Sequence, residues 1–213
     1  MNARRGGRAA AGGQVRIIGG RWRGTRLDVP DSPGLRPSGD RVRETLFNWL
    51  MHALPGARVL DLFAGTGALG WEALSRGAAT AVLVERDPAL ARRLREVAAR
   101  LSAQDRAEIV NDDALAWLTR GVGGPFDIAF VDPPFAQGLW ERALPALAPR
   151  LAPRAWIYVE SPAGQAPPVP AEWTLHREGG TREVRFALYR SADGRGADTL
   201  PSPATVAEAT VSQ

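Results

Sequence analysis

The hydrophobic positions of the chain change their period repeatedly between residues 40 and 160, and this alternation predicts an α/β fold. Short apolar runs typical of buried strands cover residues 58–61, 80–85, 107–110, 126–131 and 154–160. Between them, apolar residues recur at helical spacing over residues 68–76, 88–102, 112–118 and 138–149. Strands and helices that alternate in this way form a parallel sheet with both faces covered. A further helix is expected from residue 40, with Asp40 or Ser38 as its cap.

Two hairpins are expected outside this alternating region. Residues 14–18 and 25–29 alternate in part and flank a tip of glycine, arginine and tryptophan. Residues 173–177 and 182–190, separated by residues 178–181, predict an antiparallel hairpin that closes one edge of the sheet. The expected organisation is a disordered basic tail (1–13), an amino-terminal hairpin with its connector (14–39), one domain (40–190) and a disordered tail (191–213).

Composition narrows the chemistry that this domain can carry. The 213 residues suffice for one substantial core, and the absence of cysteine excludes disulfides and thiolate metal sites. His52 and His176 are isolated and cannot form a metal centre by themselves, so we expect no metal. No apolar stretch is long enough to cross a membrane or to act as a secretory signal, and we therefore expect a cytoplasmic protein, which we take to be a monomer.

The positive charge of the chain is concentrated at its amino terminus. All 27 basic residues are arginines, and residues 1–43 carry ten of them against three aspartates, a net +7, whereas the remainder is net −3. Such asymmetry indicates a polyanionic partner, and nucleic acid is the preferred interpretation over a solvated basic arm. The tip could stack Trp22 on a base while guanidinium groups meet phosphates, although Trp22 could equally pack on the domain surface. The candidate RNA contacts are Arg16, Arg21, Trp22, Arg23, Arg36, Arg41 and Arg43.

A glycine-rich loop follows the first strand of the predicted sheet. Residues 65–70 satisfy G-x-G-x-x-G, and Glu85 ends the next strand, where it could bind the hydroxyls of a ribose. This pattern alone also fits a nicotinamide or flavin dehydrogenase. Three features favour S-adenosylmethionine instead. Asp61 is better placed for a cationic amino-acid moiety than for a pyrophosphate, Asp112 or Asp113 can meet the adenine amino group, and the sheet ends in an antiparallel hairpin.

The tetrapeptide Asp132-Pro133-Pro134-Phe135 follows another apolar strand, at residues 126–131. Its prolines stiffen the chain, so the Asp132 side chain and the Pro133 carbonyl can direct two acceptors toward one small volume. An exocyclic amine of a nucleobase needs this arrangement, because its lone pair must be drawn out of conjugation and aimed at the methyl carbon. Phe135 offers a face for the base. A stiff turn without chemistry is the alternative, and the donor loop in the same domain disfavours it.

Several separate stretches together resemble the RsmD family of bacterial 16S rRNA guanine-N2 methyltransferases. They are residues 15–24, residues 35–50, the glycine loop with residues 74–76, residues 131–135 and residues 157–160, and the resemblance spans residues 14–190. It implies a class I S-adenosylmethionine-dependent methyltransferase fold, Rossmann-like, with a seven-stranded mostly parallel sheet. It also implies that the substrate is a guanine of 16S rRNA in an assembled or late-assembly small ribosomal subunit.

The resemblance further implies roles for individual residues. Asp61, Gly65, Gly67, Glu85 and Asp113 match the donor site, and Phe63, Thr66 and Arg86 beside them complete our expected set. Residues 132–135 match the catalytic motif, and residues 36–43 border both donor and RNA. The extended termini have no counterpart in the family. An N6-adenine methyltransferase and an RNA-binding assembly factor with a methyltransferase fold remain as alternatives, and Phe135 does not decide between guanine and adenine.

Overall fold

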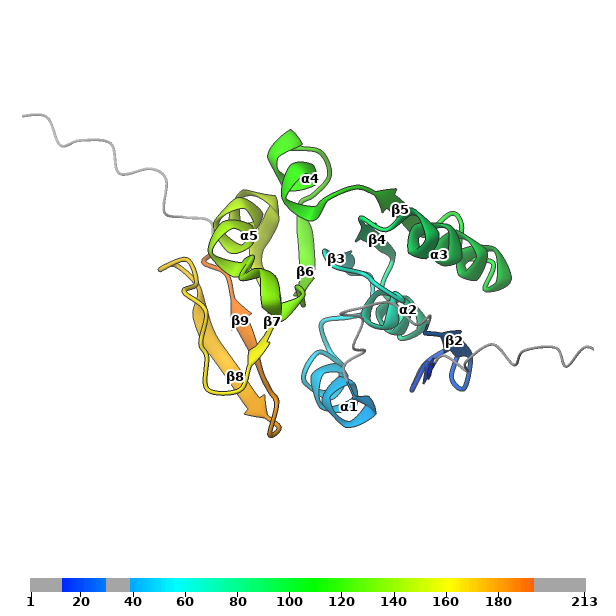
Figure 1. Cartoon of the computed structure of the whole chain (residues 1–213), viewed down its shortest axis with the longest axis horizontal. Helices are drawn as coiled ribbons and strands as arrows, with labels where there is room; N and C mark the ends of the chain where they lie inside the picture. The colour runs from blue at the N-terminus through cyan, green and yellow to red at the C-terminus, as the bar shows by residue number, and fades with distance from the viewer. Residues whose placement is uncertain (1–12, 30–38, 194–213) are drawn as a thin grey trace, which may run out of the picture.

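A seven-stranded sheet forms the centre of the molecule, as a computed structural model that describes residues 13–29 and 39–193 shows (Figure 1). Its order is β5-β4-β3-β6-β7-β9-β8, and every neighbouring pair is parallel except the two pairs that involve β9. The strands are β3 (Arg58–Asp61), β4 (Thr80–Glu85), β5 (Ala107–Asn111), β6 (Phe126–Val131), β7 (Leu151–Pro162), β8 (Thr174–Gly180) and β9 (Val184–Arg190). The predicted α/β fold with a mostly parallel sheet is therefore confirmed.

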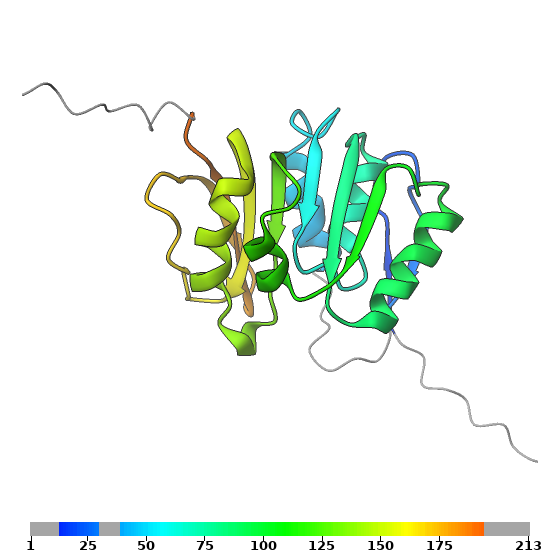
Figure 2. The ribbon, with the colours of Figure 1, turned by 90° about the horizontal axis from the view of Figure 1, so that it is seen from above.

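Helices cover both faces of this sheet (Figures 1 and 2). They are α1 (Asp40–Trp49), α2 (Ala68–Ser75), α3 (Pro88–Arg100), α4 (Ala114–Arg120) and α5 (Trp140–Leu147). One buried cluster joins α1, α2 and α3 to one face, and a second joins α4 and α5 to the other. Within the described residues, no helix is long and apolar enough to cross a membrane.

The N-cap of α1 and the first residue of α4 differ from those expected. Gly39, rather than Asp40 or Ser38, is the N-cap of α1; Ser38 lies outside the described residues. The Asp40 carboxylate instead accepts hydrogen bonds from the side chains of Arg16 and Arg43. Helix α4 begins at Ala114, two residues later than expected, because Asp113 caps it by accepting hydrogen bonds from two backbone N–H groups of its first turn.

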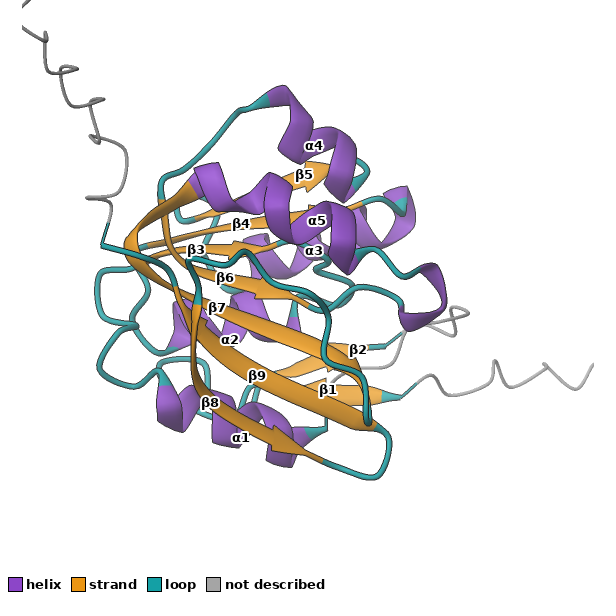
Figure 3. Cartoon of the chain, turned by 90° about the vertical axis from the view of Figure 1, so that its left-hand side faces the viewer, coloured by secondary structure: helices purple, strands orange, loops and turns teal. Residues whose placement is uncertain are grey.

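The final hairpin places the last strand inside the sheet (Figure 3). Strand β9 pairs with β7 on one side and with β8 on the other, so β8 forms the edge. Residues 178–180, expected in the turn, continue β8, and the turn lies at residues 181–183. Gly179 serves packing there, because a Cβ at this position would lie 2.4 Å from the Phe186 ring.

The amino-terminal hairpin forms a separate two-stranded sheet, β1 (Gln14–Arg16) and β2 (Arg26–Asp28), that packs against α2. Its open end, at Val15 and Val29, packs against Ala68 at the start of α2. Its tip lies at the other end of α2, where the N–H groups of Arg21 and Trp22 donate to Ser75. The tip is thus about 10 Å from the start of α2, at 1.5 Å per helical residue.

Candidate active site

The glycine loop and residues 132–135 follow two neighbouring parallel strands, β3 and β6. The register pairs Asp61 with Phe130, and the Leu62 N–H donates to the Phe130 carbonyl at 3.1 Å. The connections from β3 and β6 lead to helices on opposite faces, so the carboxyl ends of these strands form the crevice where open α/β sheets bind ligands. The structure therefore brings the two predicted motifs together.

Left-handed backbone shapes the glycine loop. Gly65 and Gly67 have φ angles of 55° and 75°, and Gly67 is the N-cap of α2. A Cβ at Gly67 would lie 2.4 Å from Nε1 of the buried Trp71. A Cβ at Gly70 would come within 3.0 Å of Leu83, so this glycine lets α2 lie close to the sheet. The half-buried Thr66 lies between the first two glycines.

Asp61 is a buried carboxylate at the base of this loop, with 3% of its surface exposed. Its Oδ2 accepts a hydrogen bond from the Gly70 N–H at 2.9 Å. Burial, with a smaller contribution from the Glu85 charge, raises the pKa of Asp61 to about 7, although the Gly70 hydrogen bond opposes the shift. A cationic group beside Asp61 would stabilise its ionised form, so the site suits an ammonium group.

Glu85 joins the loop to the end of β4. Its two carboxylate oxygens accept hydrogen bonds from the backbone N–H groups of Gly65, at 2.8 Å, and Asp87, at 2.7 Å. Each carboxylate oxygen can accept a second hydrogen bond, so Glu85 retains the capacity to bind hydroxyl groups.

The other two predicted donor-site residues lie beside the loop and after β4. The half-buried Phe63 packs against the cluster that includes α4 and α5. Exposed Arg86 donates a hydrogen bond to Gln137 at 3.4 Å and so links β4 to the segment after residue 135.

The two aspartates after β5 have different surroundings. Asp112 accepts a hydrogen bond from the Asp113 N–H and forms an ion pair with Arg120. Asp113 is exposed, and its Oδ1 accepts both of the capping hydrogen bonds of α4. Its Oδ2 accepts no hydrogen bond from the described residues. Asp113 is therefore the better candidate for contact with an adenine amino group.

Residues 132–135 leave β6 and enter a single 3-10 turn, Phe135–Gln137. Asp132 is half-buried and Pro133 is buried, so the two groups lie at the edge of the core. The Phe135 ring lies 5.9 Å from that of Trp140, at an interplanar angle of 43°. Trp140 is itself anchored, because its Nε1–H donates to the Glu160 carbonyl at 2.8 Å.

Two residues of β7, Tyr158 and Glu160, border this site, and neither is among the functional residues that the sequence predicts. The Tyr158 hydroxyl donates to Oε1 of Glu160 at 2.6 Å. Burial raises the pKa of Tyr158 well above its usual value, and the Glu160 and Asp132 charges raise it further. The available signal was an acidic residue near the end of an apolar run, a position that Glu160 shares with Asp61, Glu85 and Asp132.

Two of the predicted RNA contacts are wrong. Trp22 is only 9% exposed; it belongs to the buried core, and the Arg106 guanidinium lies 5.4 Å from its ring centroid, so the ring is not presented to a base. Arg43 is 0% exposed. Its Nη2 donates to Oδ1 of Asp40 at 2.7 Å and to the Arg16 carbonyl at 3.0 Å, and its Nη1 lies 3.8 Å from Glu72. Arg43 therefore holds α1, α2 and β1 together.

The other predicted RNA contacts divide by position. Arg21 and Arg23 are exposed at the hairpin tip, the end of α2 remote from the glycine loop. Arg16 and Arg41 are exposed near the start of α1, where Arg16 pairs with Asp40. Arg36 lies outside the described residues, as does most of the two expected tails.

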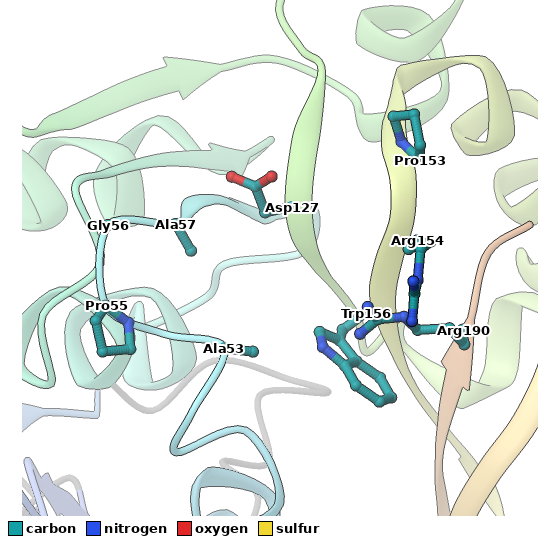
Figure 4. A pocket seen from close by; sticks show the side chains of 9 residues that line it. All are labelled: Ala53, Pro55, Gly56, Ala57, Asp127, Pro153, Arg154, Trp156 and Arg190. Atoms are coloured by element: carbon teal, nitrogen blue, oxygen red, sulfur yellow. The ribbon is translucent and has the colours of Figure 1, made fainter. Parts of the chain in front are cut away.

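A hollow of about 550 Å³ lies near the amino-terminal ends of the parallel strands, whereas the two motifs lie at the carboxyl ends (Figure 4). The residues that line it are Ala53, Pro55, Gly56 and Ala57 before β3, Asp127 near the start of β6, and Pro153, Arg154, Trp156 and Arg190. At about 3.3 Å per strand residue, Asp127 is about 17 Å from Asp132, so this hollow is remote from the two motifs. Among residues 13–29 and 39–193, no group of three or more His, Asp or Glu side chains could hold a metal ion.

Comparisons with known proteins agree with this arrangement. The family model described as "Conserved hypothetical protein 95" matches residues 15–190. Ribosomal RNA small subunit methyltransferase D of Escherichia coli is 53% identical over 85% of this chain and 93% of its own length, and the Haemophilus influenzae protein of that name is 44% identical over 85% and 96%.

Solved structures give the same result for the fold. The structure of yhhF from Escherichia coli has a TM-score of 0.78 at 49% identity and covers 85% of this chain and 99% of its own. A Haemophilus influenzae structure has a TM-score of 0.73 at 40% identity and covers 84% and 99%. The predicted class I methyltransferase fold with its amino-terminal hairpin is confirmed. The chain therefore belongs to the RsmD family, whose matched members are named ribosomal RNA small subunit methyltransferase D.

Proposed function

We propose that this protein transfers a methyl group from S-adenosylmethionine to the exocyclic N2 amine of a guanine in 16S rRNA. The observation that carries the proposal is the placement of the glycine loop and residues 132–135 at the carboxyl ends of adjacent strands. The names of the relatives support an rRNA substrate, and the resemblance supports guanine, its N2 amine and an assembled or late-assembly small subunit as the target.

The residues around the loop fit S-adenosylmethionine. Asp61 can bind the ammonium group of its methionine part, Glu85 its ribose hydroxyls and Asp113 its adenine amine. Backbone of the loop approaches closely because Gly65 and Gly67 have no side chain there. When bound, the donor supplies a methyl group attached to a positively charged sulfur, which is a good leaving group.

The acceptor side then needs to orient one amine and to remove one proton. The Asp132 carboxylate and the Pro133 carbonyl can each accept a hydrogen bond from the amine, which turns its lone pair toward the methyl carbon. Nitrogen gains the methyl group and loses a proton, and Asp132 is the nearest group to guide that proton away. Phe135, held by Trp140, provides a face on which the unstacked base can lie.

Replacing Asp132 tests whether this residue acts on the acceptor amine and not on the methyl donor. Asp132→Ala should lower methyl transfer by at least about 100-fold while it leaves donor affinity nearly unchanged, because Asp132 acts on the acceptor. Methyl incorporation into isolated small subunits measures the first quantity and titration calorimetry the second. Asp105→Ala, an exposed aspartate remote from both motifs, is the matched control. Unchanged turnover in the Asp132 variant would sink the mechanism.

Mass spectrometry of rRNA nucleosides from a strain without this protein tests the substrate. We expect N2-methylguanosine to disappear from one site of 16S rRNA and to return when the wild-type gene, but not the Asp132→Ala variant, is supplied. Loss of N6-methyladenosine instead would favour the adenine alternative. No loss of any methylated nucleoside would favour the assembly-factor alternative.

A further inference from the structure

This inference rests on the proposed function and concerns base selectivity. The site must distinguish guanine from the other bases that carry an exocyclic amine. Adenine, cytosine and guanine all have an exocyclic amine, but the neighbouring ring nitrogen differs. Beside the guanine N2 amine lies N1–H, a donor, whereas a ring nitrogen with a lone pair lies beside the amines of adenine and cytosine. A hydrogen-bond acceptor adjacent to Asp132 would therefore select guanine.

Glu160 lies in that position. The register pairs Val131 of β6 with Val159 of β7, so Asp132, the residue after β6, is next to Glu160 of β7. Neighbouring strands are about 4.8 Å apart. Tyr158 and Phe130, each two residues earlier, lie on the same face of the sheet with ring centroids 6.2 Å apart. Side chains two residues apart on a strand share a face, so Glu160 lies on the same face of the sheet as Tyr158 and Phe130. The Asp132 charge acts on the Tyr158 hydroxyl, which places Asp132 near that face.

Two contacts hold Glu160, one to its carboxylate and one to its main chain. The Tyr158 hydroxyl donates a hydrogen bond to its Oε1 at 2.6 Å. The Glu160 carbonyl accepts from Nε1 of Trp140, the residue whose ring also contacts Phe135. Glu160 is thereby positioned relative to the ring on which we place the base.

Burial gives this position its selectivity. Glu160 is only 3% exposed. In a site with little water, an acceptor that faces a base must be matched by a donor, because the mismatch leaves both polar groups unsatisfied. A carboxylate can accept about four hydrogen bonds, so the contact with Tyr158 does not prevent Glu160 from accepting another.

We propose that the Glu160 carboxylate accepts the N1–H of the target guanine while Asp132 and Pro133 hold its N2 amine. Adenine or cytosine in the same orientation would place a ring lone pair against the carboxylate. Glu160 thus sets the choice of base, and residues 132–135 set the chemistry.

Glu160→Gln tests this proposal on small subunits that carry either guanine or 2-aminopurine at the target nucleotide. 2-Aminopurine has the same amine as guanine but a lone pair at N1. The glutamine keeps an oxygen that can accept from Tyr158 and turns its NH₂ group toward the base. We expect kcat/KM on guanine to fall about 100-fold, and the preference for guanine over 2-aminopurine to fall at least as much. Calorimetry should show donor affinity within about twofold of wild type, which also shows that the variant is folded.

Tyr158→Phe provides a second variant, because it keeps the Glu160 carboxylate but removes the hydroxyl that donates a hydrogen bond to it. We expect it to lower the preference for guanine by about tenfold. If both variants keep the wild-type preference, Glu160 does not read the base and the proposal is overturned. If the wild-type protein fails to methylate N2 of guanine at all, the proposed function fails instead, so the two failures are distinguishable.

Discussion

The carboxylates at the ligand-binding edge of the sheet differ in their surroundings, although the sequence places them alike. Asp61, Glu85, Asp132 and Glu160 each lie at or just after the end of an apolar run. In the structure, Asp61 is buried beneath the glycine loop, Glu85 accepts two backbone hydrogen bonds, and Glu160 accepts one from a tyrosine. Their contacts come from other strands and helices, so local sequence could suggest the positions but not the roles.

Asp61 should make donor binding depend on pH. Its pKa of about 7 is above the ordinary value of 3.8, so the free protein favours the protonated carboxyl below pH 7. Binding of a cationic ammonium group favours the ionised form and lowers that pKa, so binding below pH 7 releases a proton. Donor affinity should therefore fall as the pH is lowered from 7 to 5.5, by at most about tenfold per pH unit.

Calorimetry in buffers of different ionisation enthalpy measures both the affinity and the released proton. Asp61→Asn can still accept the Gly70 hydrogen bond but cannot ionise, so its weaker affinity should not change over this pH range. A wild-type affinity that is equally independent of pH would contradict a contact between Asp61 and the ammonium group.

At the scale of elements, a buried carboxylate of α2 holds the amino-terminal hairpin. Glu72 is 0% exposed and accepts hydrogen bonds from the N–H groups of Ile18 and Gly19, at 2.6 and 2.8 Å. Arg76 donates to it at 2.6 Å, and Arg43 of α1 lies 3.8 Å away. The hairpin and α1 therefore share one ionic centre on α2.

Removal of this negative charge should destabilise the fold. Glu72→Gln has nearly the same shape but leaves Arg43 and Arg76 with less compensating charge, and loss of one partner of a buried ion pair costs about 3–5 kcal/mol. Urea unfolding followed by circular dichroism measures this loss. Glu44→Gln, an exposed glutamate of α1, should change the free energy of unfolding by less than about 0.5 kcal/mol. Equal stability of the two variants would contradict the role of Glu72.

The residues around Glu72 illustrate which features of the fold and of the site can be predicted from the sequence and which cannot. Strands and helices were predictable because their apolar period is local, and both motifs were predictable because they follow strands. The sequence predicts Arg43 and Trp22 as RNA contacts because their neighbours along the chain are basic. In the structure, Arg43 lies against Glu72, and the Trp22 N–H donates to Ser75. Both partners belong to α2 and are distant in sequence, so the burial of Arg43 and Trp22 is not visible in the local pattern.

At the scale of the whole molecule, the structure brings two arginine-rich segments together. The hairpin tip exposes Arg21 and Arg23, and the neighbouring α3 exposes Arg92, Arg93 and Arg100. The two segments touch, since Arg100 donates to the Arg26 carbonyl at 2.9 Å. Arg21, Arg23, Arg92 and Arg93 form no ion pair within residues 13–29 and 39–193. Their combined positive charge suits contact with the phosphates of an RNA strand that extends away from the ligand-binding edge of the sheet.

Neutralising the hairpin tip should weaken RNA binding without affecting the chemical step. For Arg21→Gln with Arg23→Gln, we expect KM for the subunit to rise while kcat stays unchanged, because these residues lie far from residues 132–135. The logarithmic salt dependence of binding should become shallower by about 0.7–0.9 for each phosphate that the tip no longer neutralises. The matched control is Arg177→Gln with Arg182→Gln, at the other end of the sheet. An unaltered salt slope in the tip variant would remove the tip from the interface.

The position of β9 has a consequence for how this protein is made. During synthesis the chain emerges from its amino terminus, so β9 emerges after every other strand of this sheet, yet it lies between two strands made earlier. Until Val184–Arg190 has emerged, β7 has no partner on the side of β9, and β8 has no partner at all. Tyr158 and Glu160 lie on β7, so their surroundings can reach their final form only after Arg190 has emerged.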